Sequence, residues 1–402
     1  MNLIQSPILK KTAGRAAPFL AGSAFLLLAA SIVVSPESSF EASLQGLKLW
    51  WTIVFPALLP FLMLTEMLAA SGFLHGLGVL LEPFMRRVFR LPGASGWVLA
   101  AGMTAGFPAG AAGAARLHGQ GAATSAEAAR LGAIAHFASP VTVVVVFGAA
   151  LLHRPSAGYA LLAAHWLGGL LAGVLAARFS RPAAAAEAPK PAAEQPAGGP
   201  LRRALAAAEA ARAEDGRSFG RLLGETVASA VQQLMATGGL MIIFAVIIHV
   251  VSQAFGGRSA DPAAALLELH LGAGRLAGHG PASLAGLILL AAALGWSGLC
   301  AQLQALAALK SSSRAALRFA AHRLLHAGLS ALLLPAFLFI SQKLQARESA
   351  EVFAPLPAGG PHTLPSIWMS LPQLLMLQFA LVTLLSLLSA FMYVRHRRRR
   401  PR

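Results

Sequence analysis

The chain has 402 residues, 56% of them hydrophobic and only 12% charged, which excludes an ordinary soluble domain because such domains carry about 25% charged residues. Its single cysteine, Cys300, excludes a disulfide framework and any multi-cysteine zinc or iron–sulfur site. The formal net charge of +17 comes from basic residues that gather between apolar runs and at both ends. We therefore expect basic loops and the tail to contact anionic lipid, and we expect no nucleic-acid partner.

Apolar runs of about 20 residues predict an all-α polytopic membrane protein, with about eight transmembrane helices and interrupted or re-entrant segments. The first run follows a basic lead but lacks a small-residue cleavage site, so we predict a retained helix rather than a signal peptide. The apolar segments, in chain order, are 17–35, 53–73, 95–113, 132–152, 157–179, 226–251, 283–305, 322–341 and 367–394. Between them we predict amphipathic interfacial stretches at 40–52 and 76–92, and a polar helix at 114–131 that contains a capping-box pattern.

Composition divides the chain into two membrane halves, 17–179 and 216–394. A linker and charged helix, 180–215, separates the halves, and a basic lead, 1–16, and a basic tail, 395–402, flank them. Each half repeats the same order of an amphipathic lead, an apolar segment, a polar connection and a glycine-rich break. The similarity is weak letter by letter, so the order of elements is the stronger indication of two repeats.

Two apolar segments contain backbone that cannot stay helical. In 95–113, Pro108 removes a backbone donor and the neighbouring glycines lower helix propensity, and 295–298 interrupts 283–305 in the same way. Unpaired backbone groups cost several kcal/mol in hydrocarbon, so broken backbone persists only where protein or water surrounds it. Two such breaks in corresponding halves predict a transporter binding site, although a kink or close helix packing would explain either break alone.

The topology depends on whether 95–113 returns as a hairpin or crosses the membrane. A hairpin gives eight crossings and places both termini in the cytoplasm. It also places every basic segment on the cytoplasmic side, as the positive-inside rule requires. These segments are 86–90, 114–130, 178–221, 310–323 and 395–402. A crossing would put the charged linker helix outside, so we favour the hairpin.

Several polar residues are candidates for chemistry inside the membrane. Glu66 is the only carboxylate within the apolar segments of the first half. It could bind a coupling proton or cation, pair with a histidine or arginine of the other half, or reach the interface from a helix end. His136 and Ser139 begin another apolar segment beside a further proline break at Pro140. Gln302 and Gln304 follow the break at 295–298, where they could bind a polar solute or join helices. The predicted solute-binding residues are Gly106, Phe107, Pro108, Ala109, Gly110, His136, Ser139, Gly295, Trp296, Ser297, Gly298, Gln302 and Gln304.

The expected solute is a small organic anion. Helix N-termini at the breaks present unpaired N–H groups and the positive ends of helix dipoles, and arginines are frequent nearby. No phosphate-binding P-loop and no His-Glu-x-x-His sequence occurs, which argues against an ATP-driven pump and a zinc protease. We therefore expect no enzyme activity, no cofactor, and no catalytic or metal-binding residues. A homo-oligomer is compatible with this sequence.

A longer set of motifs carries a resemblance to a known family. They include Val54-Phe-Pro-Ala-Leu-Leu-Pro-Phe61, Leu81-Glu-Pro-Phe-Met-Arg86, Gly106-Phe-Pro-Ala-Gly-Ala111, Glu127-Ala-Ala-Arg-Leu131 and Gly295-Trp-Ser-Gly298. In these the chain resembles the YlbJ/SpoVV family of sporulation integral membrane proteins, which carry a nucleoside-recognition "Gate" domain. The resemblance implies two Gate-type halves and transport of dipicolinic acid across the outer forespore membrane for spore maturation and cortex formation. Relatives carry a lysine where this chain has Ala112 and a more polar stretch where it has 136–139, so its specificity could differ.

Two other functions remain open from the sequence. A nucleoside or nucleobase carrier would share the Gate architecture. A membrane scaffold that does not transport would instead recruit spore cortex or coat proteins through the basic linker and tail. Deleting 182–200 and 396–402 would abolish the function of a scaffold, whereas a transporter would mostly tolerate the deletion.

Overall fold

The computed structural model describes residues 7–179, 199–255, 261–277 and 283–351, and every regular element in these ranges is a helix. Five helical segments are long and apolar enough to cross a membrane. They are Pro36–Ala70, Pro155–Phe179, Phe219–Gln253, Leu284–Ala308 and Ser313–Lys343. The protein is thus an all-α polytopic membrane protein, as composition predicts. The predicted span 367–394 and the tail 395–402 lie outside the described residues.

Helix α1 (Pro7–Val34) contains the predicted first span, of which Gly22–Val34 forms a shorter apolar helix segment. The predicted interfacial stretch 40–52 is not a separate element, because α2 (Pro36–Leu49), π-helical η2 (Trp50–Val54) and α3 (Phe55–Ala70) form one continuous rod. Trp50 explains the difference. Its ring is 4% exposed and its Nε1–H donates to the carbonyl oxygen of Leu234 at 3.0 Å, so it is buried against protein rather than placed in headgroups.

That rod packs antiparallel to α10 (Phe219–Phe255). Small residues bring the two elements close together, because a Cβ added at Gly46 would meet Ala245 at 2.9 Å and one added at Gly238 would meet the Trp50 ring at 2.5 Å. In lipid, such close packing of small residues replaces the hydrophobic effect as the main force between helices.

The predicted amphipathic stretch 76–92 forms α4 (Phe73–Phe84) and π-helical η3 (Met85–Phe89). A single 3-10 turn, η4 (Gly93–Ser95), follows, and α4 packs on the charged helix α9 (Pro200–Asp215). Glu82 joins them by accepting from Arg203 at 2.7 Å. Linker and first half are therefore in direct contact.

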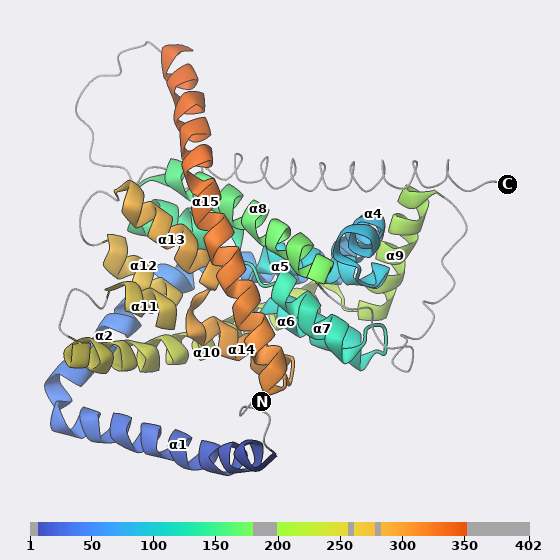
Figure 1. Cartoon of the computed structure of the whole chain (residues 1–402). Coiled ribbons are helices and arrows are strands. Elements are labelled where there is room, and N and C mark those ends of the chain that lie inside the picture. The colour runs from blue at the N-terminus through green and yellow to red at the C-terminus, as the bar shows by residue number, and fades with distance from the viewer. Residues whose placement is uncertain (1–6, 180–198, 256–260, 278–282, 352–402) are drawn as a thin grey trace.

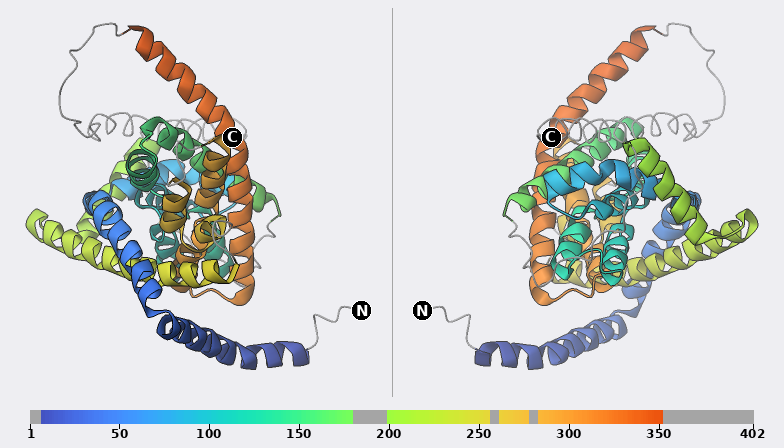
Figure 2. Two further views of the ribbon diagram at one scale, coloured as in Figure 1. Left: turned by 90° about the vertical axis from the view of Figure 1, so that its left-hand side faces the viewer. Right: turned by 90° about the vertical axis from the view of Figure 1, so that its right-hand side faces the viewer.

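The centre of the molecule is built around α15 (Ser313–Glu351), which runs beside α8 (Pro155–Phe179) and α13 (Leu284–Trp296) (Figure 1). Gly168 meets Ser330 and Gly295 meets Ala327 across these contacts. Figure 2 shows that α1 and the C-terminal part of α15 extend away from the packed body. Shorter helices complete the body: α5 (Gly96–Ala105), α6 (Ala109–Gly119), α7 (Ser125–Ile134), π-helical η5 (Val141–Leu151), α11 (Asp261–Leu267), α12 (Leu269–Ala277) and α14 (Gly298–Ala308). The predicted capping box of Thr124 and Glu127 opens α7.

Candidate functional site

The first break lies between α5 and α6, at residues 106–108. Gly106 has φ +79°, a left-handed value that favours glycine, and the Phe107–Pro108 peptide is cis. The two helices have 10 and 11 residues, so each is about 15 Å long, half the thickness of the hydrocarbon core, and they pack against each other. This geometry is that of a re-entrant hairpin.

The second break lies between α13 and α14. Ser297 has φ +71° and Gly298 has φ +73°, so two consecutive residues are left-handed and the helix cannot continue. The Ser297 hydroxyl donates to the Trp296 carbonyl oxygen, and Gln302 Nε2 donates to the same oxygen at 2.8 Å. Gln302, about one turn after the break, thus provides a hydrogen-bond donor for the last carbonyl group of α13.

A third break lies within the apolar run 132–152, next to the proline break that the sequence indicates at Pro140. Helix α7 ends at Ile134, and five buried residues without helical structure, 135–139, precede Pro140 and η5. Pro140 disfavours a helical conformation for the residue before it. In addition, the backbones of Gly102 and Gly110 both approach Ala135 closely. A Cβ added at either glycine would lie within 2.2 Å of the Ala135 carbonyl oxygen.

The three breaks meet. The Phe107 N–H donates to the Phe137 carbonyl oxygen at 2.7 Å, which joins the first break to the third. His136 Nε2 lies 3.0 Å from Ser297 Oγ, which joins the third to the second across 161 residues. The His136 ring also stacks on Phe107 at 4.9 Å and contacts the edge of Phe319 at 5.2 Å. The meeting point is therefore both polar and aromatic.

Arg323 of α15 holds the second and third breaks together. The side chain is fully buried, and all five of its N–H groups have acceptors. Nε and Nη2 donate to Gly295 O at 2.9 and 2.6 Å, Nη1 donates to Ala133 O at 3.1 Å and His136 O at 2.9 Å, and Nη2 also meets His326 Nδ1. Within the described ranges, no carboxylate forms an ion pair with this guanidinium.

Two of the three carbonyl groups that Arg323 binds belong to helix ends, and the third, that of His136, lies in the third break. Ala133 and Gly295 lie in the last turns of α7 and α13, where carbonyl groups have no partner within the helix and the dipole is negative. The guanidinium therefore supplies hydrogen bonds and a compensating charge to both C-termini. The helices α6, η5 and α14 begin just after the three breaks, so their N-termini present the positive ends of the helix dipoles there.

Two histidines extend this network. His326 Nε2 donates to His165 O at 2.7 Å, and its Nδ1 faces Arg323. His165 Nε2 accepts from the Ala138 N–H at 2.9 Å, and the two imidazole rings stack at 4.5 Å. The His165 ring thus binds Ala138 of the third break, and the His326 ring joins α15 to α8.

Several buried ring nitrogens near the breaks have no hydrogen-bond partner among the described residues. They are Nδ1 of His136, Nδ1 of His165 and Nε2 of His322. Because Ser297 Oγ already donates to Trp296 O, it accepts from His136 Nε2–H, so the neutral ring leaves Nδ1 as an unsatisfied acceptor. Each unsatisfied buried polar group costs about 1–3 kcal/mol, a cost that a bound solute or water would remove.

The other predicted site residues are distributed as follows. Ser139 is buried and its hydroxyl bonds the Thr142 hydroxyl at 2.9 Å. Ala109 and Gly110 open α6, and Gly298 opens α14. The Trp296 indole points away from the meeting point and donates to Leu266 O at 2.9 Å. Gln304 lies a turn further on and faces Cys300 Sγ at 3.5 Å.

Glu66 is not at the meeting point. It pairs with Arg217 at 3.5 Å, and Arg217 also pairs with Asp215 at 2.8 Å and Glu225 at 3.2 Å. Hydrogen bonds with these carboxylates, from Asp215 first, raise the pKa of Arg217. Pairing with an arginine of the other half was one of the roles expected of Glu66. This ionic cluster of Glu66, Asp215, Arg217 and Glu225 ties the end of α3 to the start of α10.

The sequence reasoning missed the most deeply buried charge. The sequence places Arg323 in the basic segment 310–323, which we predict on the cytoplasmic side, but its side chain is fully buried within the protein. The sequence feature that indicates its burial is the spacing of the polar residues around it. His322 and His326 accompany it on a helix in which the next charged residue is Lys343, a pattern that predicts a polar strip facing protein.

Comparison with known proteins gives two matches. Residues 51–152, which contain the first and third breaks, match the family model Gate, described as nucleoside recognition. The chain is 39% identical over 233 residues to the sporulation integral membrane protein YlbJ of Bacillus subtilis (strain 168), a match that covers 58% of this chain and 56% of that protein. The matched region thus spans about half the length of this relative. No solved structure matches the chain. The resemblance inferred from the motifs is confirmed: this integral membrane protein is similar to the sporulation protein YlbJ over 58% of its chain, and residues 51–152 match the Gate model.

Proposed function

We propose that the protein is a membrane transporter that binds a small organic anion where its three breaks meet. The observation that carries the proposal is the convergence of 106–108, 135–139 and 295–298 next to a buried guanidinium that no described carboxylate neutralises. The helix ends and carbonyl groups offset part of the cost of this buried positive charge, and an anion bound nearby would lower the remainder. Three helix N-termini begin at the same place and add donors for an anion.

The proposed solute is dipicolinic acid, moved across the outer forespore membrane. This identity comes from the resemblance to sporulation proteins, and the aromatic surroundings of His136 suit a flat pyridine ring. Phe107 and His136 already form a parallel pair, so a planar solute could insert in the same orientation. The breaks are closely packed, so binding requires them to separate, as alternating access would.

A nucleoside carrier is the second candidate, because the matching family model is described as nucleoside recognition. The same stacked rings would accept a nucleobase. Competition separates the two candidates. Uridine should not displace labelled dipicolinate from purified protein if the solute is dipicolinate, and should displace it if the site binds nucleosides.

The test is exchange of labelled dipicolinate across proteoliposomes that contain the wild type, Pro108→Leu or Ser297→Leu. We expect saturable exchange by the wild type and at least tenfold slower exchange by both variants. Ser313→Leu, at an exposed position on α15, serves as a matched control and should exchange like the wild type. Undiminished exchange by Pro108→Leu and Ser297→Leu would remove this site assignment.

A further inference from the structure

A second buried polar group lies beside the second break, at the junction of α11 and α12. His270 Nδ1 lies 2.9 Å from Glu268 Oε1, and the Leu271 N–H donates to Glu268 Oε2 at 2.7 Å. The two side chains are only 7% and 5% exposed. An ionisable pair buried this deeply in a membrane protein marks a functional site by default.

The pair lies against the second break and against η5, the helix that follows the third break. A Cβ on Gly298 would lie 3.0 Å from Leu269 N and 3.4 Å from the Glu268 Cα. On the other side, the His270 ring contacts Phe147 of η5 at 5.7 Å. A change of charge on the pair is therefore transmitted directly to the elements that follow the second and third breaks.

One atom of the pair is left without a partner among the described residues. His270 Nε2 is buried and makes no hydrogen bond. The Nδ1 contact with Glu268 fixes the orientation of the ring and leaves Nε2 as the position that gains or loses a proton. When protonated, Nε2 can donate a hydrogen bond to a solute carboxylate.

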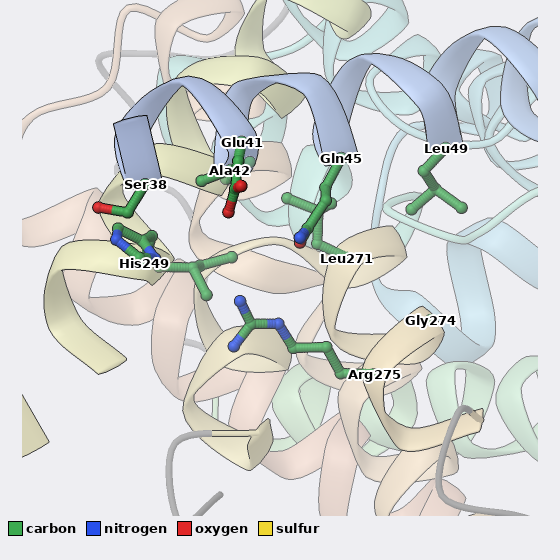
Figure 3. A pocket seen from close by; sticks show the side chains of 11 residues that line it. Ser38, Glu41, Ala42, Gln45, Leu49, His249, Leu271, Gly274 and Arg275 are labelled. Atoms are coloured by element: carbon green, nitrogen blue, oxygen red, sulfur yellow. The ribbon is translucent and has the colours of Figure 1, made fainter. Parts of the chain in front are cut away.

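A pocket of about 450 Å³ lies beside the segment that carries this pair, and Leu271, the residue after His270, is part of its lining. It lies between α2, α10 and α12, and Figure 3 shows Glu41 and Gln45 pointing from α2 toward the guanidinium of Arg275 on α12. Leu271 lines the pocket and is the residue whose N–H binds Glu268. Glu268 directly precedes α12, and Leu271 and Arg275 follow it at helical spacing on the same side. The pocket lining therefore comes within about one turn of the carboxylate.

Charged and titratable groups surround the route from several elements. Arg275 extends from α12, Glu41 from α2 and His249 from α10, and all three line the pocket. Cys300 approaches the pair from α14 and is buried. The pocket thus carries both signs of charge and is polar enough to hold water, which a proton path requires.

We propose that the Glu268–His270 pair takes up one proton when the protein binds its anionic solute, and that this pocket is the aqueous route by which the proton arrives. The proton binds His270 Nε2, converting a neutral imidazole beside a carboxylate into an ion pair, so the net charge of the pair changes from −1 to 0. Solute binding and proton binding then favour each other. The added proton removes the negative charge of the pair and supplies a hydrogen-bond donor for the anion, and the bound anion stabilises the added positive charge. This inference rests on the proposed transport function.

The test uses an imposed pH gradient across proteoliposomes with the membrane potential clamped at zero. If one proton accompanies each solute, the wild type should accumulate labelled dipicolinate about tenfold for each unit of pH gradient. Glu268→Gln and His270→Gln should still exchange labelled for unlabelled solute, yet should lose accumulation. Glu66→Gln is the matched control, because Glu66 lies in the ionic cluster away from the breaks, and it should accumulate like the wild type.

The outcomes separate this inference from the proposed function. Exchange without gradient-driven accumulation by the wild type, or accumulation that survives in both Glu268→Gln and His270→Gln, would overturn the coupling site and leave transport intact. Absence of any exchange by the wild type would remove the transport function and this inference with it. Infrared difference spectra of purified protein with and without dipicolinate add a readout independent of flux. Imidazolium bands that appear on solute binding in the wild type should be missing in His270→Gln, and their persistence would contradict the assignment.

Discussion

At the scale of single residues, one side chain decides how the breaks are held. Arg323 binds the last-turn carbonyls of α7 and α13 at once, which only a flat group with five fixed donors can do. A lysine ammonium offers three donors from a single point and would leave part of this set unpaired. The positive charge also complements the negative ends of both helices.

We predict that Arg323→Gln lowers the stability of the folded protein by at least about 3 kcal/mol, because it leaves buried carbonyl groups without donors. Thermal unfolding of the purified protein in detergent measures this as a marked fall in the midpoint. Arg318→Gln, on an exposed turn of the same helix, should unfold like the wild type. Equal stability of Arg323→Gln and the wild type would show that the guanidinium does not hold the breaks.

Some of the residue-scale features could be predicted from the sequence. His136 and Ser297 were both selected, the first for its position at the start of an apolar segment and the second for the break around it. Their contact was not predictable, because 161 residues separate them and no local pattern encodes a long-range pairing. Arg323 was missed because a basic segment that ends in an apolar run looks the same whether its last arginine faces lipid or protein.

At the scale of elements, the breaks depend on close backbone approach. Gly102 of α5 and Gly110 of α6 lie on either side of the first break and both contact Ala135 in the third. The proline and glycines predicted the first break, and glycines predicted the second. Pro140 indicated the position of the third break. Its extent over 135–139 was not predictable, because it depends on tertiary contacts with Gly102 and Gly110.

We predict that Gly102→Ala and Gly110→Ala each destabilise the protein by about 1–3 kcal/mol, because the added methyl group would overlap the Ala135 carbonyl. Gly119→Ala, in the last turn of α6 with nothing within 4 Å of the added Cβ, is the control and should not be destabilised. Unfolding midpoints in detergent measure the difference. If all three variants behave alike, the contact of the hairpin with Ala135 has been misplaced.

At the scale of the whole molecule, α10 contributes residues to two polar regions, one near each end of this helix. Glu225 belongs to the ionic cluster and His249 lines the pocket, 24 residues later, or about 36 Å along the helix. The hydrocarbon core is about 30 Å thick, so the two regions fit at opposite interfaces. Glu66 therefore lies at an interface, which explains why a carboxylate within an apolar segment carries an ion pair.

Acid should weaken the ionic cluster in a defined pH window. Hydrogen bonding with Arg217 holds the pKa of Asp215 below its usual 3.8, so the stabilisation is present above that value and is lost as pH falls through the lower folded-state pKa. We predict that Asp215→Asn is less stable than the wild type by under about 1 kcal/mol near neutral pH, because solvent screens the pair. Unfolding midpoints measured from about pH 7 to about pH 3 should converge at the acid end. A difference that grows with acidity would contradict this sign.

The opposite placement of the two regions can be measured directly. In a Cys300→Ala background, Gln45→Cys in the pocket and Ala213→Cys on α9 should react with an impermeant thiol reagent from opposite faces of the membrane. With both termini in the cytoplasm, as we propose, only Ala213→Cys reacts from the cytoplasmic side. Labelling of both positions from one face would invert the arrangement.

Composition and apolar run length predicted the all-α membrane class, because lipid permits few alternatives for a chain this apolar. The register of the long rod over 36–70 was not predictable, since the amphipathic pattern of 40–52 suits an interface as well as a buried helix face. The Glu268–His270 pair lies in a segment treated as a polar connection, where nothing local indicates burial.

The most direct test of the central claim is equilibrium binding of labelled dipicolinate to the purified protein. If the meeting point of the three breaks holds the anion, the wild type binds saturably and Ser297→Leu, which fills the space between His136 and the second break, binds at least tenfold more weakly. Saturable binding of equal affinity in both proteins would contradict the account.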